Sequence, residues 1–204
     1  GGGRRGGTVV TETSNVEISG NAVVKHIACG GITDGQSSIT NVKNVHLSVK
    51  DDARVAMLLG GGYDTWGSPG TGSTISGNIT IEIKGGTVGY IYGGGYRGSI
   101  GIESNESTTA SPLESITIDI TGGKVLHDVF GGGRGGLDKV CHNSDGTINW
   151  GTSQNDTVGH SKVYVRNLTI SIGEKATIGG NVYGGGESTP IITNYDGVEK
   201  PYNN

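Results

Sequence analysis

Three aromatic residues stand directly before clusters of glycine in this 204-residue chain: Tyr92, Phe130 and Tyr183. Flat aromatic faces beside backbone N–H groups are suited to the rings of sugars, and they are equally suited to another protein surface. The alternation of the preceding residues would turn these rings outward. The chain also bends here, and we expect these rings to close a corner of the core. The alternative is an aromatic ladder that contacts a glycan or another protein.

Two tryptophans, Trp66 and Trp150, lie in segments of variable length that follow the glycine clusters. Each tryptophan either pins its segment down or is displayed to a ligand. Insertions at one register of a repeat emerge on one side of the fold, which is often the binding side. We expect the inserts after Gly62, Gly95 and Gly133 to border the ladder, with glycans or cell-surface proteins as partners.

Cofactor and metal chemistry both fail on geometry. Gly93, Gly95 and Gly98 have the spacing of a dinucleotide-binding turn, but that mechanism needs a helix N-terminus, and no helical period follows. The longest insert contains polar residues whose spacing matches neither a structural zinc site nor a calcium loop: Asp138, Cys141, His142, Asp145 and His160. We predict neither a cofactor nor a metal site.

Acid–base catalysis would need clustered carboxylates, or a nucleophile with its base. The outward-facing charged residues of the predicted strands each lie in a different repeat: Glu17, His46, Glu82 and Asp119. Glu82 and Asp119 would be neighbours if the repeats stack in register, and such pairs more often bind a cation or repel each other. We predict no catalytic residues and no enzyme, and a polysaccharide-degrading enzyme is the weakest alternative.

The elements that must position these residues form a repeat. Strands with strictly alternating apolar and polar residues are predicted at residues 16–18, 45–49, 79–83, 116–120 and 168–172. A turn and a second apolar segment follow each strand. The repeat cores lie near residues 16–31, 45–62, 79–95, 116–133 and 168–186, and we call them repeats 1 to 5.

Units that bury only one face need stacked neighbours to close a core. The pattern therefore predicts an all-β, parallel β-solenoid of about five coils, similar to a right-handed β-helix, as a single domain over residues 1–204. An antiparallel β-sandwich is the alternative, because regularly spaced short strands also suit that fold.

The chain contains 41 glycines, and the middle glycine of each full cluster is predicted to form a corner of the solenoid: Gly61, Gly94, Gly132 and Gly185. Glycine tolerates positive φ and close backbone approach, so that a stacked column of glycines lets every coil turn at the same place.

Charge and hydropathy limit the partners. The formal net charge of −4 leaves no basic surface for nucleic acid. No apolar run is long enough to span a bilayer, so membrane insertion is not expected. The two cysteines, Cys29 and Cys141, do not make a disulfide framework.

The order of an alternating strand, Gly-Gly-x-Val and Val/Ile-Tyr-Gly-Gly-Gly resembles repeats of very long, adhesin-like secreted surface proteins of anaerobic and gut-associated bacteria. The resemblance covers residues 16–186 and is strongest in "ITIEIKGGTVGYIYGGG" (79–95) and "LTISIGEKATIGGNVYGGG" (168–186). Repeats 1 and 2 depart from it, because Cys29 stands in a glycine position and Asp51-Asp52 replace the glycine turn. The resemblance implies an extracellular β-solenoid with a structural or adhesive role.

We therefore expect a secreted, non-enzymatic segment of a longer repeat protein that acts as a stalk or adhesive surface. The alternative is a filament subunit that self-associates head to tail, because solenoid ends without caps expose unpaired sheet edges.

Overall fold

The computed structural model describes residues 8–33, 40–64, 73–96, 100, 112–137, 141–142, 148–149, 158–159 and 163–187. Every regular element in these ranges is a β-strand. The main sheet has 11 strands, and all of its pairings are parallel. The predicted all-β, parallel class is confirmed, and the antiparallel β-sandwich is excluded.

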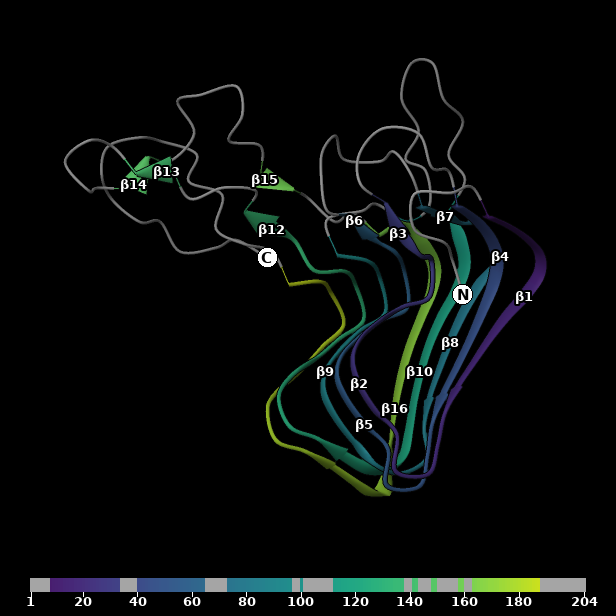
Figure 1. Cartoon of the computed structure of the whole chain (residues 1–204), viewed down its shortest axis with the longest axis vertical. Helices are drawn as coiled ribbons and strands as arrows, with labels where there is room; N and C mark the ends of the chain where they lie inside the picture. The colour runs from purple at the N-terminus through teal and green to yellow at the C-terminus, as the bar shows by residue number, and fades with distance from the viewer. Residues whose placement is uncertain are drawn as a thin grey trace.

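The first strand of each repeat forms one wall of this sheet. These strands are β1 (Thr8–Ile18), β4 (Thr40–Val49), β8 (Asn78–Ile83), β10 (Leu113–Val125) and β16 (Val165–Ile178). They pair in the order β1-β4-β8-β10-β16, so that repeats that follow one another in sequence also lie side by side (Figure 1). All five predicted alternating strands are confirmed as parts of these elements.

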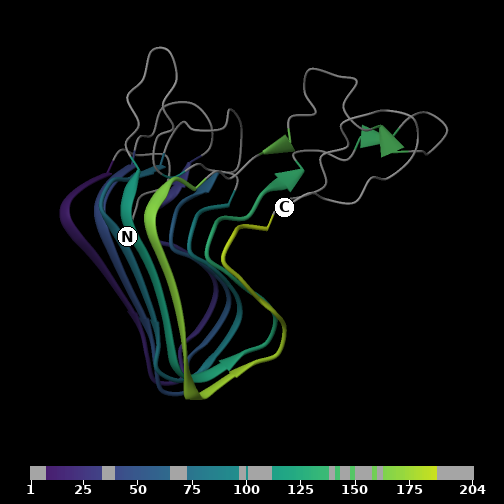
Figure 2. The same ribbon diagram turned by 180° about the vertical axis from the view of Figure 1, so that it is seen from behind.

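The second apolar segments form the other wall. They comprise β2 (Val23–Ala28), β5 (Arg54–Leu59), β9 (Thr87–Tyr92), β11 (Val129–Phe130) and β17 (Val182–Tyr183), together with the final residues of β10 and β16. The parallel order is β2-β5-β9-β11-β17. Figures 1 and 2 show the two walls diverging from a line of turns, which gives the sheet the form of a half-barrel.

Seven shorter strands lie beyond these walls. They are β3 (Ile32–Thr33), β6 (Tyr63–Asp64), β7 (Ser73–Ile75), β12 (Gly136–Leu137), β13 (Cys141–His142), β14 (Ile148–Asn149) and β15 (Val158–Gly159). β3 pairs in parallel with β6, and β7 pairs in parallel with β4. The pairs β12–β15 and β13–β14 are antiparallel.

The turn between the two walls requires a left-handed backbone. Gly20, Gly86 and Gly123 have φ between 61° and 78°, and Asp51 has φ 58° in the same turn of repeat 2. The Asp51 carboxylate compensates in part, because its Oδ2 accepts a hydrogen bond of 2.9 Å from the backbone N–H of Gly20. The sequence departure at this turn is thus a strained residue that ties repeat 2 to repeat 1.

Aliphatic side chains from both walls fill the inside of the half-barrel. Alternation directs one residue in two inward, and strand register then places these residues in columns. Leu47, Ile81 and Ile118 form one such column and are fully buried. Ile170 of repeat 5 continues the column and is only partly buried.

We predict that Ile118→Asp prevents folding, because an unpaired carboxylate buried in the middle of this column costs several kcal/mol in a domain of marginal stability. The matched control is Thr117→Asp, which carries the same charge on the outer side of the same strand. Circular dichroism and urea denaturation should show a cooperative unfolding transition for the control alone. Two equally stable variants would contradict the inward alternation.

Candidate binding surface at the glycine bend

The aromatic ladder belongs to a second apolar cluster on the outside of the second wall. Tyr92 and Phe130 are buried there together with Met57 and Leu59, and we call these four residues the outer cluster. Alternation explains the orientation, since the neighbouring Ile91 and Val129 point into the main core. Partly buried residues cover the outer cluster. Tyr63 and Tyr96, which follow the glycines in sequence, pack against it, and so do Ala28 and Tyr90 of the second wall.

The rings of the predicted ladder stack on one another. The Tyr92 and Phe130 centroids are 5.1 Å apart at an interplanar angle of 1°, and those of Phe130 and Tyr183 are 4.9 Å apart at 12°. Tyr92 is 1% exposed and Phe130 is 7% exposed, whereas Tyr183 is 40% exposed. Stacked and buried faces cannot receive a sugar. Tyr92 and Phe130 face outward, as the alternation predicts, and are buried in the outer cluster. Of the three ladder rings, only Tyr183 keeps an accessible face.

A polar group closes the outer cluster across three repeats. The Tyr92 hydroxyl donates a hydrogen bond of 2.5 Å to Glu187 Oε2, and Arg134 Nε lies 3.2 Å from the same oxygen. The Arg134 guanidinium also lies 5.8 Å from the Tyr92 ring centroid and 5.5 Å from that of Tyr96, within cation–π range. Burial raises the pKa of the Tyr92 hydroxyl, and the bond to Glu187 raises it further. These contacts hold repeats 3, 4 and 5 together at the bend.

Partly exposed rings surround the cluster and were not identified from the sequence. Tyr63 stacks on Tyr96 at 4.6 Å, and Tyr90 stacks on His127 at 4.4 Å. The sequence does contain a pattern for the first pair, because Tyr63 and Tyr96 each stand directly after the last glycine of a cluster. The strand alternation used to predict outward residues does not extend past the glycines, and so this second column was missed.

Three of the four middle glycines, Gly61, Gly94 and Gly132, are required by close approach alone, whereas a Cβ on Gly185 would meet nothing within 4 Å. None of the four middle glycines has a positive φ. The prediction named positive φ and close approach as reasons for glycine here, and the first of these is wrong. A Cβ on Gly94 would lie 2.7 Å from the backbone nitrogen of Gly133, and one on Gly132 would lie 2.6 Å from that of Gly186. The same clash occurs at Gly61 with Gly95. Glycine is required because the backbone of the next repeat occupies the space of a side chain.

Cys29 takes a glycine position in repeat 1. Its side chain is buried in the main core and forms no disulfide. Burial raises the pKa of the thiol to about 12, so that the thiol stays protonated at neutral pH. A protonated, buried thiol is a packing group and a poor nucleophile.

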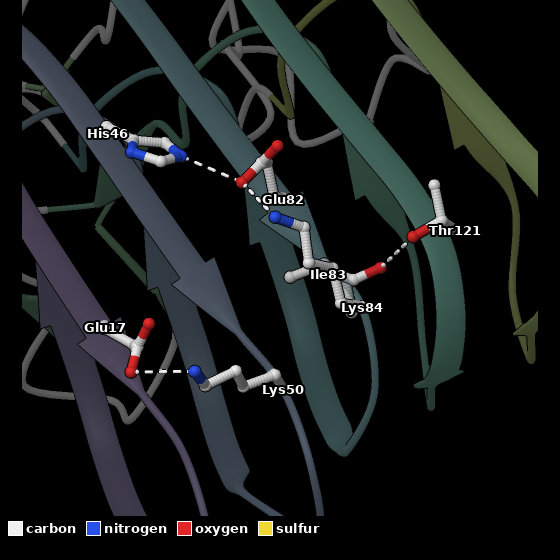
Figure 3. A network of polar contacts seen from close by, with 7 residues as sticks. All are labelled: Glu17, His46, Lys50, Glu82, Ile83, Lys84 and Thr121. Atoms are coloured by element: carbon white, nitrogen blue, oxygen red, sulfur yellow. Dashed lines mark hydrogen bonds and ion pairs between the residues drawn. The ribbon is translucent and has the colours of Figure 1, made fainter.

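Charged and polar residues on the outer face of the first wall contact one another both within a repeat and between repeats (Figure 3). Glu82 Oε2 lies 2.7 Å from Lys84 Nζ and 2.8 Å from His46 Nε2, and Glu17 lies 3.0 Å from Lys50. Glu82 and Asp119 are register neighbours, as the stacking hypothesis predicts. Hydrogen bonds from Lys84 and then from His46 lower the pKa of the Glu82 carboxyl. The group has the features of a surface ion-pair network.

Metal binding has no support in the part of the chain that the structure describes. No group of three or more His, Cys, Asp or Glu residues there could hold an ion. Trp66 and Trp150, and the insert residues Asp138, Asp145 and His160, lie outside the described residues. The same ranges contain no helix long and apolar enough to cross a membrane.

The points where the inserts leave and rejoin the sheet are nonetheless aligned. Tyr63, Tyr96, Arg134 and Glu187 follow the glycine clusters and pair with one another in sequence order. Returning residues are aligned as well, since Thr40 pairs with Ser73 and Leu113 pairs with Val165. The inserts therefore leave the sheet along one column, and the described returning residues are aligned in these two pairs.

Comparison with known proteins finds no family model, no curated protein and no solved structure that matches this chain.

We predict that Gly94→Val and Gly132→Val each lower the free energy of unfolding by about 3 kcal/mol or more, since a side chain there overlaps the adjacent backbone. Gly185→Val is the matched control, because nothing lies within 4 Å of a Cβ at that position. Urea denaturation of dilute protein measures the difference. If the three variants have equal stability, close approach is not the reason for the glycines.

We also predict a pH-dependent effect of Glu82→Gln. A carboxyl whose pKa is lowered on folding contributes stability above the ordinary glutamate pKa of about 4.3, and that stability is lost as the pH falls through the folded pKa. The variant should be less stable than wild type by under about 1 kcal/mol at pH 7, and the difference should shrink when the pH is lowered to about 3. Exposed Glu174→Gln is the control and should change stability at neither pH.

Proposed function

We propose that this chain is a non-enzymatic, extracellular β-solenoid module of about five coils with a structural or adhesive role. The observation that carries the proposal is the continuous parallel register from repeat 1 to repeat 5. One inward column runs through Val16, Leu47, Ile81, Ile118 and Ile170, one residue from each repeat. A parallel stack of this kind advances by about 4.8 Å per coil and forms a short, stiff rod.

The internal bonding supports a structural role for the rod. Outer aromatic rings stack along the same axis as the aliphatic columns. On the other wall, the Glu17–Lys50 ion pair links repeats 1 and 2, and the His46–Glu82 hydrogen bond links repeats 2 and 3. Several polar side chains of the described residues, such as Tyr92, Glu187 and Glu17, therefore bond to neighbouring repeats. The extracellular location rests on the resemblance to secreted adhesin-like repeats.

The adhesive part of the proposal concerns the side where the inserts attach. Their aligned ends bring Tyr63 and Tyr96 to this side, next to the outer cluster. Trp66 and Trp150 belong to the inserts themselves. Aromatic residues supply contact area at low conformational cost, and this makes glycans or cell-surface proteins the expected partners. Tyr92 and Phe130 would serve this surface as internal support.

A glycan array and binding to intact cells test the adhesive role. We expect the wild-type chain to bind and the double variant Trp66→Ala, Trp150→Ala to bind at least about tenfold more weakly with an unchanged circular dichroism spectrum. Thr80→Ala on the opposite wall is the control and should bind as the wild type does. Equal binding by the double variant would remove the inserts from the contact surface. Cleavage of any polysaccharide by the purified chain would contradict the non-enzymatic assignment.

A further inference from the structure

The two ends of the sheet differ from its interior in what they expose. Within the described residues, β16 and β17 pair on one side only, and so do β1 and β2 at the opposite end. Ile172 is 46% exposed and Val182 is 42% exposed, whereas their register partners Ile120 and Val129 in repeat 4 are fully buried. The edge of repeat 5 thus presents aliphatic columns, and the stacked ladder ends there in the ring of Tyr183.

Two glycines at this edge, Gly184 and Gly185, have no neighbouring backbone that would exclude a side chain. In the interior, Gly131 and Gly132 face the backbone of the next repeat at 2.6 Å. Gly184 and Gly185 stand in the same columns, and a Cβ on either would meet nothing within 4 Å. Glycine in an open position costs conformational entropy and gains no packing. A further backbone lying on repeat 5 would require both glycines.

We propose that the backbone that covers repeat 5 is repeat 1 of a second copy of this chain, stacked head to tail in continued parallel register. The proposal rests on the β-solenoid architecture argued above and names its partner. Three features of repeat 1 fit this edge: its columns and turn length, its charge, and its hydrogen-bonding position.

The columns of repeat 1 match those of repeat 5. Register through the sheet places Val16 in the column of Ile170 and Ile18 in the column of Ile172. Turn length also agrees. In the paired registers, Val23 follows Ile18 by five residues and Thr177 follows Ile172 by five, whereas the step in repeats 3 and 4 is four residues.

Opposite charges would meet at the junction. On the outer face of the first wall, Lys43 pairs with Glu12 at 3.7 Å and Arg166 pairs with Glu114 at 3.3 Å. Arg166 lies on the free edge of repeat 5, and Glu12 lies on the free edge of repeat 1. Head-to-tail stacking sets Glu12 of the second copy beside Arg166, and the alternation of sign along this face continues across the junction.

The hydrogen-bond pattern at the bend extends in the same direction. The first glycine of each cluster donates its N–H to the carbonyl of the residue before the next cluster: Gly60 to Tyr92, Gly93 to Phe130 and Gly131 to Tyr183, at 2.8–2.9 Å. The next donor in this series is Gly184, and its acceptor is Ala28 of the second copy. The Tyr183 ring then covers a small alanine. Because the two contacting edges differ, the contact is heterologous and leads to open filaments.

The variant Gly185→Val tests the proposed contact without disturbing the fold, because a Cβ at this position meets nothing within 4 Å in the single chain. Sedimentation velocity over increasing concentration should show the wild-type chain growing beyond its monomer mass of 20.8 kDa. The Gly185→Val chain should unfold at the same urea concentration and bind its own kind at least about tenfold more weakly. Thr80→Ala, on the outer face of β8 in the interior of the sheet, is the control and should associate as the wild type does.

Charge exchange tests the orientation of the stack. Glu12→Arg alone and Arg166→Glu alone should each associate more weakly than the wild type, because like charges then meet at the junction. An equimolar mixture of the two variants should recover association. When the two chains alternate in the stack, residue 166 of each chain meets a residue 12 of opposite charge. No recovery would overturn the head-to-tail register.

A monomeric wild type with a β-sheet spectrum would overturn self-association and leave the β-solenoid standing. In that case the edge is covered by another part of a longer chain or by a different partner. An unfolded wild type would contradict the proposed module itself. Equal association by Gly185→Val would show that the contact lies elsewhere on the molecule.

Discussion

The distance between hydrogen-bonded parallel strands, about 4.8 Å, is the constraint on which the rest of this structure depends. Repeats stacked at this spacing leave no room for a Cβ where the chain bends after the second wall, and glycine is required at Gly61, Gly94 and Gly132. The same spacing suits aromatic rings that stack face to face, as the Tyr92, Phe130 and Tyr183 rings do at 4.9–5.1 Å. The glycine columns and the aromatic ladder thus have a common cause.

Two apolar clusters follow from this constraint. Alternation along the second wall directs aliphatic residues into the half-barrel and larger residues to its outside, where the chain beyond the glycines covers them. The outer cluster is closed by the Tyr92–Glu187–Arg134 group, which joins repeats 3, 4 and 5. Rings arranged in this way contribute to cohesion between repeats. In the adhesive role that we propose, recognition is left to residues at the rim and in the inserts.

A parallel stack has no natural end, because each edge has the same backbone groups that pair the repeats inside it. Natural sheet proteins usually cover or charge such edges to prevent association. Here Ile172, Val182 and Tyr183 remain exposed at one edge, beside glycines that fit a further backbone. An adhesive rod and a self-assembling rod are therefore compatible descriptions of one architecture, since stacking lengthens the rod and repeats its insert side.

The sequence by itself determined the first strand of each repeat and its inward residues, because apolar residues such as Ile79, Ile81 and Ile83 recur with period two. The same period suits an antiparallel β-sandwich, so the register of the strands decided the parallel pairing. Only the tertiary structure decided what the outward aromatic residues do. Periodicity tells which side of a strand a side chain takes, and it does not tell what lies on that side. Tyr96 and Glu187 reach Tyr92 from beyond the glycines and from another repeat. The burial of Tyr92 thus depends on residues outside its own strand, and the alternation within one strand cannot predict it.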